Sequence, residues 1–286
     1  MSVRLVACDL DGTLLNDDKV ISKRNHGAIK LLENNNIDFI ICTGREKNSV
    51  IELKKKHQVE CEAILMNGAL YMDKNNNVCF SKKVSDEAVR KIIEIFDKYD
   101  CAFIVQTLNG IRSRFTYDEL LANFAEHMVE IGWATSLQQA HEKMVDFNFF
   151  VGNQKFEDVE ELLKDGVLKL ENHQNHNPSI TAEINKELEE IEGISIVYYP
   201  SGNVEITDKS ANKGQTLYEV MKLKGYQMDE VIPFGDEDND YSMLSLFPNS
   251  VAMCNGNERV KKVAGKISQF NNHQDGVAIE IEELFK

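Results

Sequence analysis

Two aspartates stand where an apolar run meets a glycine turn near the start of the chain. Asp9 and Asp11 follow the apolar residues 3–8, which favour a buried strand, and Gly12 marks the end of that strand. Side chains two apart on an extended chain point the same way, so both carboxylates face one site. Asp-Gly alone is common in turns, but a carboxylate that closes a buried strand needs a charged or metallic partner. We therefore interpret the pair as a chemical site.

Further along the chain lie other groups suited to phosphate and metal chemistry. These groups are Thr43, Gly44 and Arg45 after residues 37–42, Lys213 at the start of a predicted helix, and the acidic run from Gly235 to Asp240 after residues 231–234. A hydroxyl, glycine N–H groups and a helix N-terminus suit phosphate oxygens, and the carboxylates of Asp9 and Asp236 suit Mg²⁺. Taken singly, each group is also compatible with a helix cap or a solvated surface charge. Their joint occurrence predicts a phosphate and metal site.

The predicted elements bring these groups to one edge of a sheet. Strand and helix patterns alternate before residue 80 and again after residue 213, which is typical of a parallel sheet with crossover helices. We predict an α/β, Rossmann-like core with helices on both faces, made of residues 1–82 and 210–286. Residues 83–209 have a mixed α+β pattern and are predicted to form an inserted domain. Ligands bind at the carboxyl ends of the strands in such sheets.

Composition and charge restrict the partners. The chain has 286 residues and a formal net charge of −15, which argues against nucleic acid or an anionic membrane as a partner. Its six cysteines form no CxxC pair, and we interpret them as reduced thiols. The N-terminus has no signal-like segment and no apolar run is long enough to span a membrane, so a cytoplasmic protein is expected. The oligomeric state is unknown at this stage.

The four groups together resemble the motifs of the haloacid dehalogenase superfamily. Its first motif has the form Asp-x-Asp-Gly-Thr, as at residues 9–13, and its second is a Thr or Ser after a strand, as at Thr43. Its third is a lysine, as at Lys213, and its fourth matches residues 235–240. The Thr-Gly-Arg triplet, the Asn-Gly-Ala at residues 67–69 and the insertion are similar to the Cof-type sugar-phosphatase subfamily. The resemblance covers essentially the whole chain.

This resemblance implies a role for each matching residue. Asp9 would be the nucleophile that forms an aspartyl-phosphate, and Asp11 the general acid and base, a role that works best with a raised pKa. Mg²⁺ would be held by Asp9, the backbone carbonyl of Asp11, and Asp236. The phosphoryl oxygens would be bound by the backbone N–H of Leu10, Thr43, the N–H of Gly44, Lys213 and Asn239. Asp240 is expected to orient Lys213 rather than bind metal, and Arg45 to contact either the substrate or an ion-pair partner.

The expected function is that of a Mg²⁺-dependent phosphatase of small phosphorylated metabolites, such as sugar phosphates, with residues 83–209 as a specificity cap. A phosphomutase of the same fold is the nearest alternative, and release of inorganic phosphate separates the two. A phospho-acceptor or binding module similar to response-regulator receivers is a second alternative, because receivers also cluster acids, threonine and lysine on such a sheet. Receivers are much shorter and need no cap. The particular substrate is not evident from the sequence.

Overall fold

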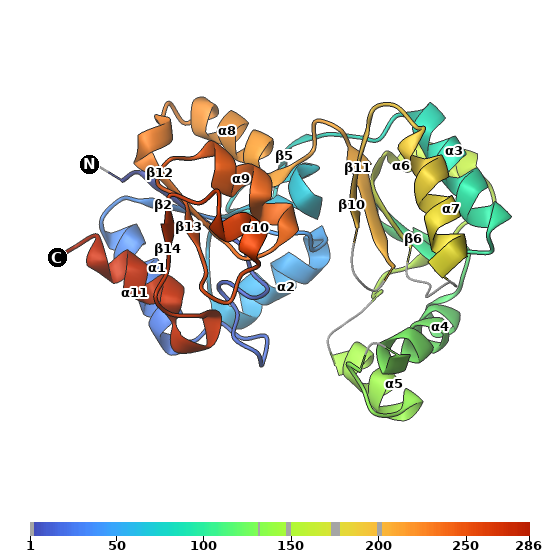
Figure 1. Cartoon of the computed structure of the whole chain (residues 1–286), viewed down its shortest axis with the longest axis horizontal. Helices are drawn as coiled ribbons and strands as arrows, with labels where there is room; N and C mark the ends of the chain where they lie inside the picture. Colours follow the sequence, from blue (N-terminus) through green and yellow to red (C-terminus); the bar gives the residue numbers. More distant parts are fainter. Residues whose placement is uncertain (1–2, 131, 147–149, 173–177, 199–201) are drawn as a thin grey trace. The chain divides into compact units, whose positions relative to one another are not determined.

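The chain divides into two compact units (Figure 1). The computed structural model describes residues 3–130, 132–146, 150–172, 178–198 and 202–286. The core unit consists of Met1–Ser81 and Ser210–Lys286, and the inserted unit is Lys82–Lys209. The chain therefore crosses between the units twice, and the core unit is assembled from both ends of the sequence.

The strands and helices of the two units are as follows. The strands are β1 Leu5–Cys8, β2 Asp38–Cys42, β3 Glu62–Leu65, β4 Leu70–Met72, β5 Val78–Ser81, β6 Phe103–Thr107, β7 Gly110–Ser113, β8 Gln154–Lys155, β9 Val167–Asn172, β10 Ile194–Tyr198, β11 Val204–Asp208, β12 Val231–Gly235, β13 Val251–Ala252 and β14 Lys266–Ile267. The α-helices are α1 Lys23–Asn34, α2 Lys47–His57, α3 Asp86–Lys98, α4 Tyr117–Glu130, α5 Leu137–Asp146, α6 Val159–Asp165, α7 Pro178–Glu189, α8 Lys213–Leu223, α9 Tyr241–Leu246, α10 Glu258–Lys261 and α11 Gly276–Glu283. Within the described residues, none of the helices is both long and apolar enough to cross a membrane.

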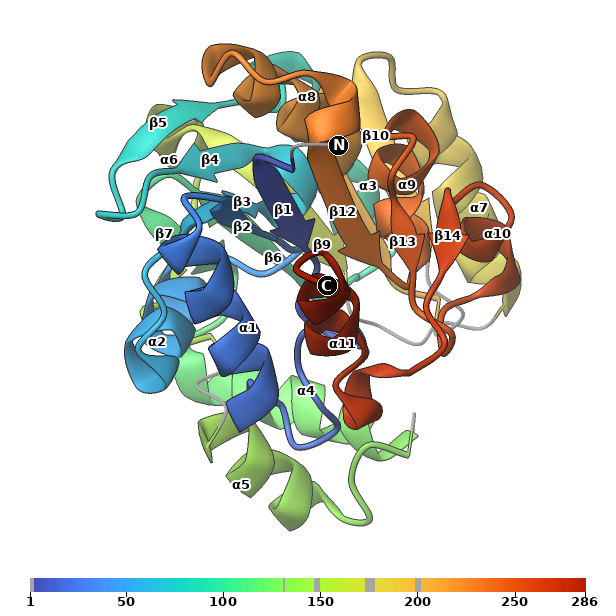
Figure 2. The same ribbon diagram turned by 90° about the vertical axis from the view of Figure 1, so that its left-hand side faces the viewer.

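The sheet of the core unit has the order β14-β13-β12-β1-β2-β3-β4-β5. The strands from β14 to β3 are parallel, and β4 and β5 form an antiparallel hairpin at one edge. Figure 2 shows α8 and α9 on one side of this sheet and α1 and α11 on the other. Apolar side chains of the sheet, such as Leu5, Ala7 and Ile40, pack against α8, α9 and α10. The predicted α/β fold, with a parallel sheet between two layers of helices, is confirmed.

Strand β1 lies near the centre of this sheet. All four of its residues are apolar, as a strand covered on both faces requires, and all four are fully buried. It pairs in parallel with β2 on one side and with β12 on the other. The carboxyl ends of these three strands therefore lie side by side, and each is followed by one of the groups singled out in the sequence.

The inserted unit has a second sheet with the order β10-β11-β9-β6-β7-β8, antiparallel except for the pair of β7 and β8. Helices α3, α6 and α7 lie along one side of this sheet (Figure 1) and bury their apolar residues against it. On the opposite face, Ile104 and Ile111 pack against α4 and α5. Each unit therefore has an apolar core of its own.

Candidate active site

Asp9 directly follows β1 and is almost fully buried. Its backbone N–H donates to the carbonyl of Phe234 in β12 (3.0 Å), which continues the parallel pairing past the end of β1. The turn after it depends on Gly12, which has φ = +81° and lies so close to Asp236 that a Cβ would be 2.2 Å from Oδ2. Thr13 then donates its hydroxyl to Asp236 Oδ1 at 2.6 Å. The turn therefore brings the first and the last acidic motif together.

Lys213 connects the two acidic motifs. It is the first residue of α8, whose N-cap is Asn212, and its side chain is fully buried. Its Nζ donates to Asp9 Oδ1 and to Asp240 Oδ1, both at 2.6 Å. Burial lowers the pKa of Lys213, but the charges of Asp240 and Asp9 outweigh this effect and raise it above its ordinary value. Lys213 is therefore a permanent cation inside the site.

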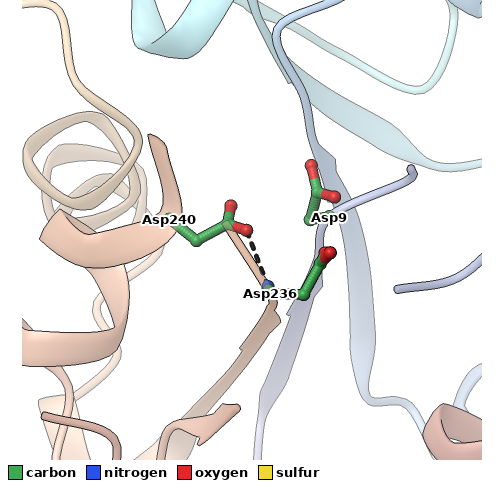
Figure 3. Close-up of side chains that lie close together, drawn as sticks. All are labelled: Asp9, Asp236 and Asp240. Carbon is green, nitrogen blue, oxygen red and sulfur yellow. Dashed lines mark hydrogen bonds between the residues drawn. The ribbon is translucent and has the colours of Figure 1, made fainter. Parts of the chain in front are cut away.

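Asp240 has both carboxylate oxygens engaged. Oδ1 accepts from Lys213, and Oδ2 accepts from the backbone N–H groups of Asp236 (2.9 Å) and Glu237 (3.1 Å). Figure 3 shows Asp240 turned toward the backbone of Asp236, with the side chains of Asp9 and Asp236 close together. This geometry fits a residue that orients Lys213 and leaves Asp9 and Asp236 as candidate metal ligands.

The carboxylates of Asp9, Asp236 and Asp240 offer oxygen atoms that all lie within 4.8 Å of one another. Burial raises the pKa of Asp9, against the opposing charge of Lys213, and the neighbouring carboxylates add to the rise. Burial also raises the pKa of Asp236 to about 7, although the hydrogen bond from Thr13 opposes it. One ammonium thus faces three buried carboxylates, and a divalent cation with a preference for oxygen ligands fits this donor set.

Asp11 points to a different set of partners. Arg45 donates from Nε to Oδ2 and from Nη2 to Oδ1, both at 2.7 Å, and Lys19 Nζ donates to Oδ1 at 2.8 Å. Burial raises the pKa of Asp11, but the hydrogen bonds and charges of Arg45 and Lys19 outweigh it and lower the pKa to about 2. The raised pKa expected for a proton donor is therefore absent in this arrangement. Arg45 was expected to contact either the substrate or an ion-pair partner, and in the structure it forms an ion pair with Asp11.

The second motif lies at the end of β2. Thr43 is buried, and its hydroxyl accepts from the N–H of Arg45 at 3.2 Å. Asn239 donates to Oδ1 of Asn67 at 3.1 Å, and a Cβ on Gly44 would be 2.9 Å from that same Oδ1. Asn67 therefore joins the second motif to the fourth.

The backbone of Leu10 is held within the turn, because its carbonyl accepts from the N–H groups of Thr13 (3.4 Å) and Leu15 (2.8 Å). Its side chain is fully buried.

Four residues at the site have no role assigned by the sequence. Thr13 belongs to the first motif and Asn67 to the Asn-Gly-Ala triplet. Both residues could therefore have been found from these motifs. Asn255 donates to the carbonyl of Gly12 at 2.8 Å, and Lys19 reaches Asp11 from the loop after it. No pattern in the sequence distinguishes Lys19 from an ordinary loop residue.

The comparisons with known proteins agree with this geometry. The family model of the haloacid dehalogenase-like hydrolases matches residues 6–281. Among curated proteins, the chain is 26% identical over 278 residues to 5-amino-6-(5-phospho-D-ribitylamino)uracil phosphatase YcsE of Bacillus subtilis, with 97% of this chain and 94% of that protein covered. It is 24% identical to YbjI of Escherichia coli, a phosphatase of the same name, over 100% of this chain and 97% of that protein.

Solved structures share the whole fold. A haloacid dehalogenase-like hydrolase from B. subtilis has a TM-score of 0.84 at 23% identity and covers 99% of this chain and 100% of its own. A sugar phosphatase of subclass IIB has a TM-score of 0.75 at 20% identity, with 99% of both chains covered. The chain belongs to the haloacid dehalogenase-like hydrolases. The predicted family and the enzyme class, a phosphoric monoester hydrolase, are confirmed.

Proposed function

We propose that this enzyme is a Mg²⁺-dependent phosphatase that hydrolyses small phosphorylated metabolites through an aspartyl-phosphate on Asp9. The observation that carries the proposal is the contact of Lys213 with both Asp9 and Asp240, beside Asp236 and at the ends of β1 and β12. The names of the relatives, which act on a phospho-ribityl compound or on sugar phosphates, support this substrate class.

In the first step, an oxygen of the Asp9 carboxylate attacks phosphorus and the bond from phosphorus to the ester oxygen breaks. Asp11 gives a proton to the leaving alkoxide. In the second step, water attacks the phosphorus of the aspartyl-phosphate, Asp11 takes a proton from that water, and the bond from phosphorus to the Asp9 oxygen breaks. Inorganic phosphate and the starting enzyme are the products.

The other residues bind the phosphoryl group. Lys213 has a third proton beyond the two that it donates to Asp9 and Asp240, and this proton is available to a phosphoryl oxygen. The hydroxyl of Thr43, the N–H groups of Gly44 and Leu10, and the amide of Asn239 would bind the remaining oxygens. Mg²⁺ held by Asp9, the backbone carbonyl of Asp11, and Asp236 would neutralise charge on the phosphoryl group.

Asp11 needs a change of partners for its part in the reaction. A carboxylate that accepts from Arg45 and Lys19 stays ionised, so it must lose at least one of these contacts before it carries a proton. Lys19 makes one contact and Arg45 makes two, so release from Lys19 breaks fewer hydrogen bonds.

In this proposal the inserted unit is a cap that selects the substrate. It also excludes bulk water during attack at phosphorus and admits the water needed for the second step.

The test is phosphate release from an aryl phosphate and from a sugar phosphate, with and without Mg²⁺. The Asp9→Asn variant should lose about a thousandfold or more of the activity because it has no nucleophile. Asp17→Asn, at an exposed aspartate of the next loop, is the matched control and should keep full activity. Unchanged turnover in Asp9→Asn would refute the mechanism, and return of the phosphoryl group to the substrate without release of phosphate would indicate a phosphomutase.

A further inference from the structure

The turn Met66–Gly68 follows β3, the parallel neighbour of β2, and its three residues are buried. Its backbone is unusual, because φ is +50° at Met66, +55° at Asn67 and +104° at Gly68. A residue with a Cβ rarely adopts this left-handed conformation, and asparagine tolerates it better than methionine does. Such backbone persists only where the surroundings hold it, and it is concentrated at functional sites. We call these three residues the β3–β4 turn and ask what holds them.

One side of the β3–β4 turn is bonded to the backbone of the second motif. The N–H of Met66 donates to the carbonyl of Arg45 at 3.2 Å, and the N–H of Asn67 donates to the carbonyl of Thr43 at 3.1 Å. These two carbonyls flank Gly44, whose N–H is a proposed phosphate donor. The position of the turn and the position of that N–H are therefore linked.

The other side of the β3–β4 turn lies against the start of α8. The hydroxyl of Thr216 donates to the carbonyl of Gly68 at 2.8 Å. A Cβ on Gly68 would lie 2.5 Å from the carbonyl carbon and oxygen of Asn212, so only glycine permits this approach. Asn212 directly precedes Lys213, the first residue of α8. The turn thus separates the second motif from Lys213 by a fixed distance.

The side chain of Asn67 contacts the fourth motif. It is 4% exposed, and its Oδ1 accepts from Nδ2 of Asn239 at 3.1 Å. An amide nitrogen has two protons, so one proton of Asn239 Nδ2 remains for another acceptor. Because an amide group is planar, the bond to Asn67 also fixes the direction of this second N–H.

We propose that Asn67 is a positioning residue for phosphoryl transfer, which holds the amide of Asn239 so that its second N–H meets a phosphoryl oxygen. The β3–β4 turn keeps this N–H at a fixed spacing from the N–H of Gly44 and from Lys213. The inference rests on the proposed function, in which these three groups bind the phosphoryl oxygens. Charge on these oxygens is stabilised best by donors that need no rearrangement during transfer. The left-handed backbone at Asn67 is what aims its amide at Asn239.

The first test compares Asn67→Gly with the wild type on an aryl phosphate in the presence of Mg²⁺. Glycine adopts the left-handed conformation freely, so this variant keeps the backbone of the turn and loses only the amide. We expect a folded protein with kcat/KM lowered about tenfold or more, the value of a hydrogen bond to a charged group. Asn36→Gly is the matched control, since Asn36 is exposed and has φ = +57°; it should keep the wild-type kcat/KM.

Two binding measurements on Asn67→Gly distinguish positioning from a merely structural role. The affinity for Mg²⁺, measured by calorimetry, should be unchanged, because Asp9 and Asp236 keep their contacts with Lys213 and Thr13. Inhibition by orthovanadate, which adopts the five-coordinate geometry of phosphoryl transfer, should weaken about tenfold. An equal loss of Mg²⁺ affinity would show that the whole site is distorted and would overturn the inference.

A double-mutant cycle tests whether Asn67 acts through Asn239. Asn239→Ala alone should lower kcat/KM, and the addition of Asn67→Gly should lower it further by less than about threefold. If the two losses multiply in full, the residues act independently and the inference is wrong.

The outcomes separate this inference from the proposed function. If the wild type releases no phosphate from any ester, the proposed function fails and the inference falls with it. If the wild type is active and Asn67→Gly is equally active, only the inference is wrong. Should Asn67→Gly not fold, Asn67→Ser takes its place with the same expected loss, since its side chain is one atom shorter and does not reach Asn239.

Discussion

Asp11 is held by two cations of different exposure, and this arrangement stabilises the fold only when its carboxyl is ionised. The pKa of Asp11 in the folded protein is about 2, below its ordinary value of 3.8. The stabilisation is therefore present above about pH 4 and is lost as the pH falls through about 2. The side chain of Lys19 is 40% exposed, so its share of this stabilisation is small.

Lys19→Met tests this linkage. At pH 6 the variant should be less stable than the wild type by up to about 1 kcal/mol, and the difference should shrink at pH 3. The measurement is the free energy of unfolding from urea titrations at both pH values. Lys30→Met, at an exposed lysine of α1, is the control. A difference in free energy of unfolding that is larger at pH 3 than at pH 6 would show that Lys19 does not stabilise the ionised carboxylate of Asp11.

Asn255 positions the turn of the first motif without touching the carboxylates. It donates to the carbonyl of Gly12, whose own close approach to Asp236 sets the distance between the first and fourth motifs. Asn255→Ala should therefore weaken Mg²⁺ binding, measured by calorimetry, and lower kcat by about tenfold. Asn35→Ala, which also removes a contact to a backbone carbonyl, should change neither. A lower melting temperature with unchanged Mg²⁺ affinity would show that Asn255 is only structural.

At the scale of single elements, two helical glycines have opposite surroundings. A Cβ on Gly27 in α1 would meet no neighbouring element within 4 Å in the described part of the chain, whereas a Cβ on Gly214 in α8 would lie 2.3 Å from the carbonyl oxygen of Ser242. Alanine favours a helix over glycine by about 1 kcal/mol, so Gly27→Ala should stabilise the protein by about 0.5–1 kcal/mol.

Gly214→Ala should have the opposite effect. The added methyl group would push α8 away from α9 and move Lys213, the first residue of α8, away from Asp9. We expect both a lower melting temperature and a loss of phosphatase activity, measured on the same preparations as Gly27→Ala. Equal melting temperatures for the two variants would contradict the close approach of α8 and α9.

The elements also show what the sequence could and could not predict. The polar residues 73–77 lie between two short apolar runs, a pattern typical of a hairpin, and β4 and β5 form that hairpin. Ser22 is a preferred N-cap residue before a helical pattern, and it caps α1. Strand β9 is not among the predicted elements, although Leu168 and Leu170 alternate with Lys169 and Glu171, a pattern typical of a half-exposed strand. The pattern does not indicate that Lys169 and Glu171 are buried, because their burial depends on tertiary packing.

The same limit applies to the site. Residues at the ends of β1, β2 and β12 could be grouped, since adjacent parallel strands bring their carboxyl ends together. The partners of Asp11 could not be predicted, because Lys19 and Arg45 reach it through loop conformations and side-chain rotamers. These depend on tertiary packing rather than on local pattern.

At the scale of the whole molecule, we expect the acidic cluster to link the stability of the core unit to pH and to metal. The pKa of Asp236 rises from its ordinary 3.8 to about 7 on folding, chiefly through burial. Between these values the folded protein binds more protons than the unfolded chain, so its stability falls as the pH rises. The Mg²⁺-free enzyme should therefore melt at a lower temperature at pH 7.5 than at pH 5.

Mg²⁺ should oppose this fall of the melting temperature with rising pH. Mg²⁺ binds ionised carboxylates, so it should raise the melting temperature more at pH 7.5 than at pH 5. In Asp236→Asn the slope between the two pH values should be smaller and the effect of Mg²⁺ weaker, as measured by differential scanning calorimetry. A Mg²⁺ effect that is larger at pH 5 would contradict the role of Asp236 as a ligand.

The two crossings between the units have a consequence for how such an enzyme changes over generations. Lys82–Lys209 has its own sheet and its own apolar core, while the acidic motifs and Lys213 all belong to the core unit. A mutation in the inserted unit can therefore alter a strand face such as that of β9 and leave the pairing of β1 with β2 and β12 intact. On the proposed division of roles, selection can act on recognition and on chemistry separately, so one inherited phosphoryl-transfer centre can be retained while the preferred ester diversifies.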